Sequence, residues 1–310
     1  MKKYVILADI TCDLSPELRE AFRVEDYIKG HVHFGDGREM ESRLDWDLIS
    51  RHEFYAALSD KKNKISTAPP NVEEYCEIFN KYVNEGYAVL SMSISSKISS
   101  TYDFSCVAAK RIKDENPAAE IYCFDAFRMS GGFGLLVCYA HQLKNEGKTM
   151  EEVIAWLEEH KTCVHQMGPI DDLMFVARRG RITMGKAVMG SFAGVKPMGD
   201  CNADGYTTVL TKAKGIKKAL DLTVRYVKET AVDLENQFVI IAHSDRELYG
   251  QTLKDLIEQQ LNPKKVYLCD VYGGSGTNVG PGRVGGYYLG APIHQDLAAE
   301  KEAMNRALGK

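Results

Sequence analysis

The 310-residue sequence lacks several features that would place it in a specialised class of protein. Basic residues are not in excess: 39 Lys and Arg stand against 43 Asp and Glu, which gives a formal net charge of −4. This balance argues against a nucleic-acid partner, because binding to phosphates needs basic patches. The eight cysteines form no C-x-x-C pair and no zinc spacing, so we expect reduced thiols.

Long apolar runs are also missing. The opening segment MKKYVILADITCDL combines two lysines with a short apolar run that meets Asp9 before the h-region of a signal peptide can form. We therefore expect a first strand over 3–8, a cytoplasmic location and no stable insertion into a membrane. The 45% of hydrophobic residues is enough for a globular chain with one large or two ordinary domains.

Catalytic and metal-binding motifs are lacking as well. There is no G-x-S-x-G elbow, no H-E-x-x-H and no cysteine in a recognisable pattern with histidine and asparagine. His31 and His33 have strand spacing but no third ligand nearby, so we expect exposed strand residues rather than a metal pair. His243 ends a predicted strand and either faces an interdomain cleft or has a core or surface position. We predict no catalytic residue, no cofactor and no metal.

Short β-rich runs alternate with helical stretches in the first half of the chain. Asn71 is a plausible N-cap, with glutamates in the first turn that follows. This alternation predicts a parallel sheet with helices on both sides, an α/β/α domain. The predicted strands are 3–8, 88–94 and 120–125, and the predicted helices are 71–85, 99–114, 131–146 and 150–161.

Beyond residue 162 the pattern mixes hairpin-like and crossover connections, which predicts a second α/β domain with a mixed sheet. We place the first domain at 1–162 and the second at 163–310. The predicted helices of the second domain are 171–178, 184–191, 214–229 and 246–260, and its predicted strands are 206–211, 237–242, 265–271 and 284–289.

The segment GGSGTNVGPGRVGGYYLG at 273–290 holds a G-x-G-x-x-G pattern in Gly280, Gly282 and Gly285. A dinucleotide-binding turn needs a strand directly before the pattern and a helix that opens on its last glycine. Strand 265–271 ends too early and a β-like run follows Gly285, so we disfavour a nucleotide site. Either the glycines only allow sharp turns and close packing, or this glycine-rich turn closes over the head group of a ligand.

Two other loops deliver hydroxyl groups from a strand end directly into a helix. Ligands of doubly wound sheets bind at the carboxyl ends of strands, where helix N-termini favour anions. The hydroxyls therefore either cap the helices alone or bind a carboxylate or phosphate. The loops are ISTAPPNVEEY at 65–75, with Ser66 and Thr67, and SMSISSKISSTYD at 91–103, with Ser95, Ser96 and Ser99.

Taken together, the motifs resemble the DegV family of bacterial fatty-acid-binding proteins, which includes the fatty-acid-carrying subunit of bacterial fatty acid kinase. The resemblance implies a two-domain carrier that is not an enzyme. It would hold a long-chain fatty acid in an apolar tunnel and present the carboxylate to a partner such as a fatty acid kinase. The matching segments are LADITCDLS, STAPP, SISSKISSTY, DDLMFVARRGRI with VKP after it, TKAKGIKKAL and TNVGPG.

The resemblance also implies roles for individual residues. Asn278 stands where the family has histidine; it donates a hydrogen bond but carries no charge at neutral pH. Arg181 and Lys196 would lie near the head group or face the partner. The implied ligand-binding residues are Ser66, Thr67, Ser95, Ser96, Ser99, Asn278, Gly280 and Gly282.

The competing hypothesis is an enzyme, a small-molecule phosphotransferase or hydrolase that uses the same anion-binding loops. It predicts a polar pocket with a metal or a general base near Ser99, whereas the carrier predicts a long apolar tunnel. The Met, Phe and Leu residues between 124 and 192 suit a tunnel or an ordinary core equally.

Overall fold

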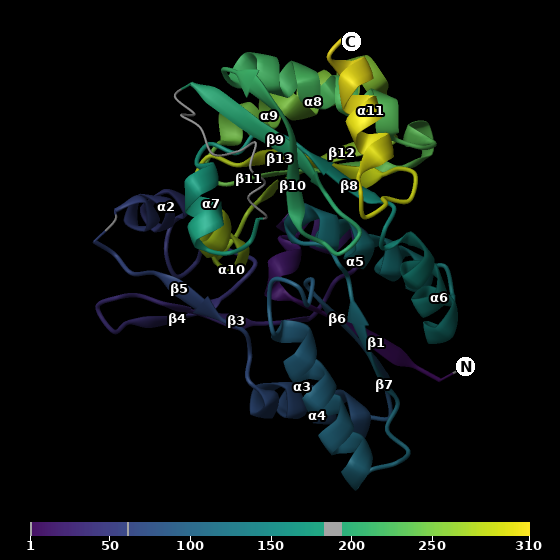
Figure 1. Ribbon diagram of the computed structural model, residues 1–310. Coiled ribbons are helices and arrows are strands. Elements are labelled where there is room, and N and C mark those ends of the chain that lie inside the picture. Colours follow the sequence, from purple (N-terminus) through teal and green to yellow (C-terminus); the bar gives the residue numbers. More distant parts are fainter. Residues whose placement is uncertain (1, 61, 183–193) are drawn as a thin grey trace.

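The computed structural model describes residues 2–60, 62–182 and 194–310. Two sheets lie one above the other, with the N-terminus beside the lower sheet and the C-terminus above the upper one (Figure 1). The predicted helix at 184–191 lies outside the described residues.

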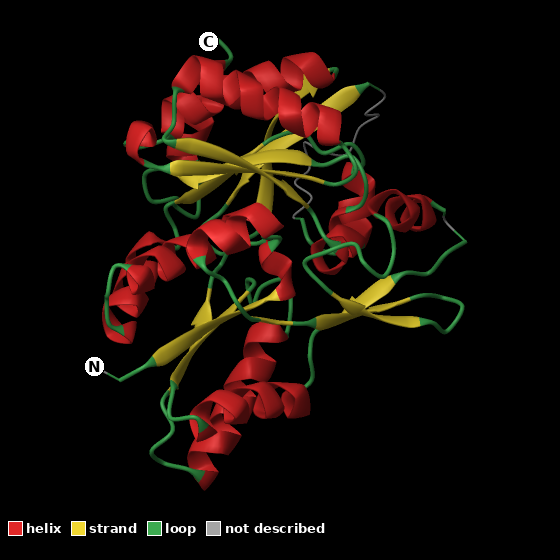
Figure 2. Cartoon of the chain, turned by 180° about the vertical axis from the view of Figure 1, so that it is seen from behind, coloured by secondary structure: helices red, strands yellow, loops and turns green. Residues whose placement is uncertain are grey.

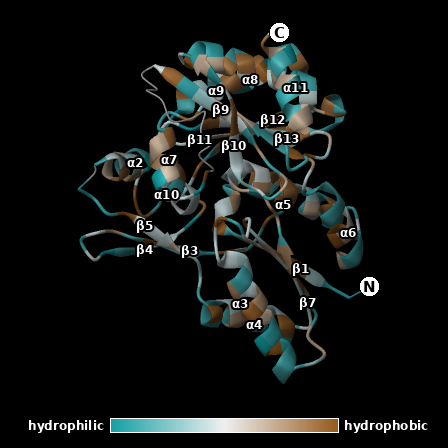
Figure 3. Cartoon of the chain, in the orientation of Figure 1, coloured by the Kyte–Doolittle hydropathy of each residue, from teal (hydrophilic) through white to brown (hydrophobic). Residues whose placement is uncertain are grey.

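The lower sheet is parallel, as predicted, with the strand order β2-β1-β6-β7. Helices α3 (Val72–Asn84) and α4 (Thr101–Glu115) cover one of its faces and share a buried core with it. Asn71 caps α3 in a capping box with Glu74, which confirms the predicted helix start. The strands are β1 (Tyr4–Asp9), β2 (Tyr27–Ile28), β6 (Ala88–Ser93) and β7 (Ile121–Asp125); β1, almost wholly buried, is brown in Figure 3.

A small antiparallel sheet, which the sequence did not predict, projects from the side of the lower sheet. Its strand order is β4-β3-β5, with β3 (Gly30–His33) between β4 (Glu39–Ser42) and β5 (Ser66–Ala68). Helix α2 (Arg51–Ser59) lies between β4 and β5 in the chain and begins with a capping box at Ser50. The strands are too short and too polar for an alternating pattern to stand out in the sequence.

The upper sheet is mixed, with the order β12-β11-β13-β8. Strands β11 and β12 are parallel, and β13 is antiparallel to both β11 and β8. Together the two sheets confirm the predicted α/β fold with one parallel and one mixed sheet. The strands are β8 (Val164–Met167), β11 (Phe238–His243), β12 (Lys265–Asp270) and β13 (Val284–Leu289).

A hairpin of β9 (Val195–Cys201) and β10 (Thr207–Lys214) lies beside the upper sheet, with a bulge between Val209 and Thr211. Helices α8 and α9 bury apolar residues against the sheet, and α11 packs on α8. The helices of this half are α7 (Leu173–Arg178), α8 (Ile216–Thr230), α9 (Glu247–Leu261), α10 (Gly273–Val279) and α11 (Ala298–Ala307), with a 3₁₀ turn η3 (Leu234–Asn236).

Helix α5 (Ser130–Asn145) lies between the two sheets, as Figures 1 and 2 show from opposite sides. Eleven of its 16 residues are buried. A helix that is apolar on nearly all sides must be enclosed, and one continuous core joins it to Leu90 of β6 and Ile240 of β11. Helices α1 (Pro16–Phe22) and α6 (Met150–His160) pack on its sides. The predicted boundary at 162 falls between α6 and β8 and stays a prediction.

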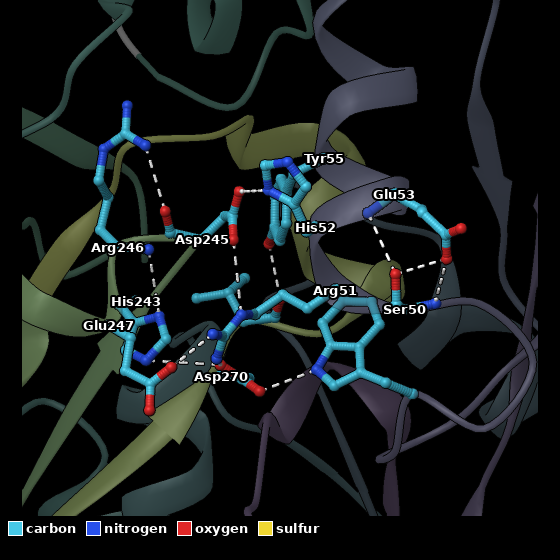
Figure 4. A network of polar contacts seen from close by, with 12 residues as sticks. Ser50, Arg51, His52, Glu53, Tyr55, His243, Asp245, Arg246, Glu247 and Asp270 are labelled. Carbon is cyan, nitrogen blue, oxygen red and sulfur yellow. Dashed lines mark hydrogen bonds and ion pairs between the residues drawn. The ribbon is translucent and has the colours of Figure 1, made fainter.

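A polar network attaches α2 to the ends of β11 and β12 (Figure 4). The Arg51 guanidinium contacts Asp270 at 2.8 Å and Glu247 at 2.5 Å. The buried Tyr55 hydroxyl donates to the carbonyl of Val271 at 2.6 Å. These contacts hold the small antiparallel sheet and α2 against the upper half of the molecule.

The backbone of α5 lies in direct contact with η1 (Ile10–Cys12), the turn that follows β1. A Cβ atom at Gly134 would overlap the carbonyl oxygen of Cys12, which is backbone and cannot swing away. We expect Gly134→Ala to lower the free energy of unfolding by about 1–3 kcal/mol, as measured by chemical denaturation.

The matched control is Gly132→Ala in the same helix. There the nearest atoms are side-chain carbons of Tyr287 at 3.3 Å and Val164 at 3.4 Å, and the better helix propensity of alanine offsets a small adjustment. A Gly134→Ala variant as stable as the Gly132→Ala variant would show that the contact with Cys12 does not restrain α5.

Candidate functional site

A cavity of about 320 Å³ lies where the small antiparallel sheet, the ends of β1 and β6, helix α10 and the upper sheet meet. This volume is at the lower end of the roughly 300–1,000 Å³ typical of small-molecule sites. Much of the wall is apolar, which suits a hydrocarbon group. Its apolar residues include Ile94, Ile98, Ile170, Val176, Ile182 and Val279.

Two predicted site residues from distant segments meet at this cavity. Thr67 lies in β5 and Asn278 lies in the last turn of α10. The Asn278 Nδ2 donates to the Thr67 Oγ1 at 3.1 Å, and both residues line the cavity. Among the described residues neither side chain has a further partner, so the Thr67 hydroxyl proton and the second amide hydrogen of Asn278 are free to donate to a ligand.

The start of α4 lies at the same cavity, which is lined by Ser99, Ser100 and Thr101. The Ser99 Oγ lies 2.7 Å from the Thr101 Oγ1 and accepts from the Thr101 N–H at 3.3 Å. The N-cap residue, Ser100, makes no side-chain cap bond. The first turn of this 15-residue helix therefore offers backbone N–H groups and a partial positive charge to an anion.

A family profile described as uncharacterised proteins of the DegV family matches residues 3–290. The chain belongs to the DegV family. A DegV domain-containing protein of Clostridium perfringens is 32% identical to it over 291 residues, which cover 94% of this chain and 98% of the relative.

Solved DegV structures share the fold. A family member from Thermus thermophilus, described as fatty acid binding, matches with a TM-score of 0.82 at 22% identity over 94% of this chain and 100% of its own. A family member from Eubacterium eligens loaded with heptadecanoic acid matches with a TM-score of 0.78 at 19% identity over 92% of this chain and 99% of its own. At these identities the likeness establishes the DegV fold.

Of the other residues that the DegV resemblance implicates, Arg181 lines the cavity, whereas Ser66, Ser95 and Ser96 do not. Ser66 is exposed on β5. The Ser95 Oγ accepts from the N–H of Lys97 at 3.3 Å, and the Ser96 N–H donates to Asp125 at 3.1 Å. These two serines thus stabilise the loop that leads to α4.

Lys196 also lies outside the cavity wall, where its ammonium group contacts Asp171 at 2.5 Å. The same carboxylate receives Arg246 at 3.4 Å. The Asp171 carboxylate therefore holds the Lys196 ammonium and the Arg246 guanidinium near the start of β9.

The expectation of a glycine-rich turn at 273–290 needs correction, because its first part is helix α10. Gly280 and Gly282 follow that helix with φ of 75° and 97°, values that favour glycine. A Cβ at Gly280 would lie 2.7 Å from the ring of Phe175, and one at Gly282 would overlap Asp171. The glycines serve close packing between this segment and α7, and neither of the two lines the cavity.

The expectation that His31 is a strand residue is confirmed, but the expectation that it is exposed was wrong. It lies on β3 with its side chain 25% exposed, contacts Glu39 at 2.8 Å and Glu74 at 2.9 Å, and lines the cavity. His31 pairs with Ala68 of β5, which also lines the cavity. His243 is 2% exposed and lies 3.4 Å from Asp270.

Two absences concern only the part of the chain that the structure describes. There, no three side chains of His, Cys, Asp or Glu are grouped to hold a metal ion. Nor does any helix within those ranges have the length and apolarity needed to cross a membrane.

The sequence reasoning missed several polar residues of the wall. Asp9 is 1% exposed and accepts from Thr11 N–H at 2.8 Å, Thr11 Oγ1 at 2.5 Å and Ile94 N–H at 2.7 Å. Burial raises its pKa, and these three bonds act against that rise. Its place at the end of the first strand was the available signal, because polar residues at strand ends gather at one edge of a parallel sheet.

Ser42, Ser130 and Arg283 are further residues of the wall that were missed. The buried Oγ atoms of Ser42 and Ser130 have no hydrogen-bond partner among the described residues. Buried hydroxyls normally find one, so Ser42 is available to a ligand, whereas Ser130 lies beside the side chains of Asp13 and Tyr287 and acts to lower the pKa of each. Arg283 could have been noticed as a lone basic residue within PGRVGG.

Asp13 lies next to the cavity, fully buried between η1 and α10. Its Oδ1 accepts from the N–H of Tyr272 at 2.9 Å, and its Oδ2 has no partner among the described residues. Burial raises its pKa to about 8, although the side chain of Ser130 and the Tyr272 N–H act in the opposite direction. The native carboxyl group is therefore largely protonated at neutral pH.

The raised pKa of Asp13 makes stability depend on pH. Between about pH 4 and pH 8 the native group keeps a proton that the unfolded group loses. The free energy of unfolding should therefore fall as the pH rises through this range, by at most about 1.4 kcal/mol per pH unit. Asp13→Asn, which keeps the acceptor for Tyr272, should show a flatter fall in denaturant titrations at a series of pH values. Equal slopes in the two proteins would mean that Asp13 ionises normally.

Proposed function

We propose that this DegV-family chain binds a long-chain fatty acid in the cavity. The carboxylate lies against Thr67, Asn278 and the start of α4, and the hydrocarbon chain follows the apolar wall. The observation that carries the proposal is the Thr67–Asn278 hydrogen bond at the cavity. It places neutral donors with free hydrogens beside a helix N-terminus in a largely apolar enclosure.

The energetics agree with this arrangement. Burying a 16-carbon tail contributes roughly 10 kcal/mol, at about 0.8 kcal/mol per CH₂ group, before ordering costs. A carboxylate that enters an apolar site must be hydrogen-bonded, because an unpaired charge there is heavily penalised. Thr67, Asn278 and the N–H groups of α4 can satisfy it without a metal.

The relatives support the same ligand class. The Thermus thermophilus protein is described as fatty acid binding, and the Eubacterium eligens protein is loaded with heptadecanoic acid. Family membership, which rests on the whole-chain match and the 32% identical relative, makes a fatty acid the first ligand to test.

The proposal extends to a carrier that is not an enzyme and that presents the carboxylate to a partner such as a fatty acid kinase. Hydrogen bonds from neutral donors leave a carboxylate oxygen able to react as a nucleophile. A strong ion pair would make that oxygen less reactive toward a phosphoryl group. Arg181 at the cavity wall and Lys196 outside it are the basic residues proposed to face the head group or the partner.

A bound fatty acid should survive purification, because most of its surface is enclosed. We expect mass spectrometry of organic extracts from the protein, expressed in bacteria, to show a long-chain fatty acid at close to one per chain. Extracts of an unrelated protein purified in the same way provide the background. No enrichment, together with no binding in a titration of the delipidated protein, would refute the proposal.

The double substitution Thr67→Val and Ser99→Ala should weaken hexadecanoate binding about a hundredfold, since two hydrogen bonds to a carboxylate are worth about 3 kcal/mol or more. Binding can be measured by calorimetry, with thermal unfolding as a check on the fold. Ser66→Ala is the matched control: the residue adjoins Thr67 but is exposed, so affinity should not change.

The same double variant should lose acyl phosphate formation when a fatty acid kinase and ATP are supplied. Unchanged affinity would place the carboxylate elsewhere in the cavity. Phosphotransfer to or hydrolysis of a polar substrate by the chain alone, without fatty acid binding, would favour the enzyme hypothesis instead.

A further inference from the structure

One wall of the cavity carries a buried cation that the proposed carboxylate site does not use. Arg283 is 6% exposed, lines the cavity and precedes β13. Its Nη1 donates to the carbonyls of Gly168 at 2.6 Å and Pro169 at 3.3 Å. No carboxylate of the described residues lies within ion-pair distance of it. Buried guanidinium groups are normally paired with an anion, so Arg283 lacks the expected counter-ion among the described residues.

The backbone around Arg283 is shaped to hold its side chain. A Cβ atom at Gly285 would lie 2.7 Å from the Arg283 Nη2 and 3.0 Å from its Cζ. The guanidinium therefore folds back over Gly285, and a larger residue there would have to displace it from this position. The last glycine of the G-x-G-x-x-G pattern thus positions an arginine.

Two further polar residues of the upper sheet, Gln166 and Tyr287, line the same cavity and face each other on paired strands. Gln166 of β8 lines the cavity and donates through Nε2 to the Thr207 Oγ1 at 2.8 Å. Tyr287 of β13 also lines it; burial raises the pKa of Tyr287, and the positive charge of Arg283 acts against that rise. The ring of Tyr287 packs on Gly131, next to Ser130, whose buried hydroxyl lies beside Tyr287 and Asp13.

These groups belong to different elements from those that form the proposed carboxylate site. Thr67 belongs to the small antiparallel sheet, whereas Arg283, Gln166 and Tyr287 belong to the upper sheet or its edge. In both Figure 1 and Figure 2 the small sheet lies below the upper sheet, and helix α10 lies between β5 and β13 in Figure 1. The cavity wall therefore carries two groups of polar residues on different elements, one around Thr67 and one around Arg283.

A saturated fatty acid has one polar group, so it can bond to only one of these two groups of polar residues. With its carboxylate at Thr67 and Asn278, a methyl terminus would displace water from Arg283 and leave a desolvated charge unpaired, which is costly. A second oxygen-bearing group on the chain would instead accept hydrogen bonds from the guanidinium and from Ser130. An anionic group would also balance its charge.

We propose that the preferred ligand is an acyl chain with a second polar group, a dicarboxylate or an ω-hydroxy acid, and that Arg283 and Ser130 bind that second group. This inference rests on the proposed fatty acid site and specifies its ligand class. Arg283 is the specificity-determining residue, and Gln166 borders the same subsite.

The test compares three ligands of equal chain length on the delipidated wild-type protein: hexadecanoic acid, 16-hydroxyhexadecanoic acid and hexadecanedioic acid. We expect hexadecanedioate to bind at least tenfold more tightly than hexadecanoate, with the hydroxy acid between them. Equal affinities, or a preference for hexadecanoate, would overturn the inference while leaving the proposed function intact. Binding of none of the three would refute both.

Variants then locate the preference. Arg283→Met keeps an unbranched apolar side chain and should abolish the preference for hexadecanedioate, whereas Arg283→Lys should retain part of it. Arg246→Met, which removes a cation outside the cavity, should leave it unchanged. Thermal unfolding checks each fold, and the wild-type ligand series remains decisive if a variant does not fold.

One variant result would reassign Arg283. If Arg283→Met weakened hexadecanoate and hexadecanedioate by the same factor, the arginine would bind the head group common to both. The proposed second subsite would then be overturned.

Discussion

The close packing of α5 against η1 is the contact on which the rest of the structure depends. Gly134 lies directly on the carbonyl of Cys12, while other residues of α5 contact β11 and β13 of the upper sheet. Because η1 follows β1 without a break, this contact fixes Asp9 and Thr11 relative to the upper sheet. The cavity lies between those parts. Its shape therefore depends on the glycine that lets α5 approach η1 closely.

The electrostatics of the cavity follow from what the wall already pairs internally. Asp9 is saturated by three donors, and His31 is held between two glutamates. Asp9 offers no donor to a ligand, and both ring nitrogens of His31 already contact glutamates. The donors that remain for the proposed carboxylate are the hydroxyl of Thr67, the amide of Asn278 and the N–H groups of α4. With asparagine in place of the histidine of the family motif, the proposed site around Thr67 offers a carboxylate hydrogen bonds and the helix dipole, without the charge of a protonated histidine.

Local signals in the sequence predicted the parallel sheet and its helices, because β-rich runs, caps and amphipathic faces act over a few residues; the Asn71 cap is an example. The small antiparallel sheet escaped since β4, EMES, carries no apolar alternation and forms through pairing with β3. Helix α10 escaped because glycines disfavour helices by about 1 kcal/mol each, and only tertiary contacts reverse this. At the site, residue type identified Thr67 and Asn278. It could not show that Ser95 and Ser96 form hydrogen bonds within their own loop and with Asp125 instead of lining the cavity. Those bonds depend on the direction of the backbone.

The glycine-rich segment shows why a spacing pattern does not by itself identify a ligand. In a dinucleotide site the same spacing lets a pyrophosphate approach the backbone. Here each glycine admits a different protein group: the ring of Phe175 at Gly280, the carboxylate of Asp171 at Gly282 and the guanidinium of Arg283 at Gly285. Two of these contacts fasten the segment to the neighbouring residues of 171–178, which places Asn278 within reach of Thr67. The third brings a positive charge to the cavity wall. The pattern therefore brings a charged side chain, rather than a row of backbone amides, to the cavity wall.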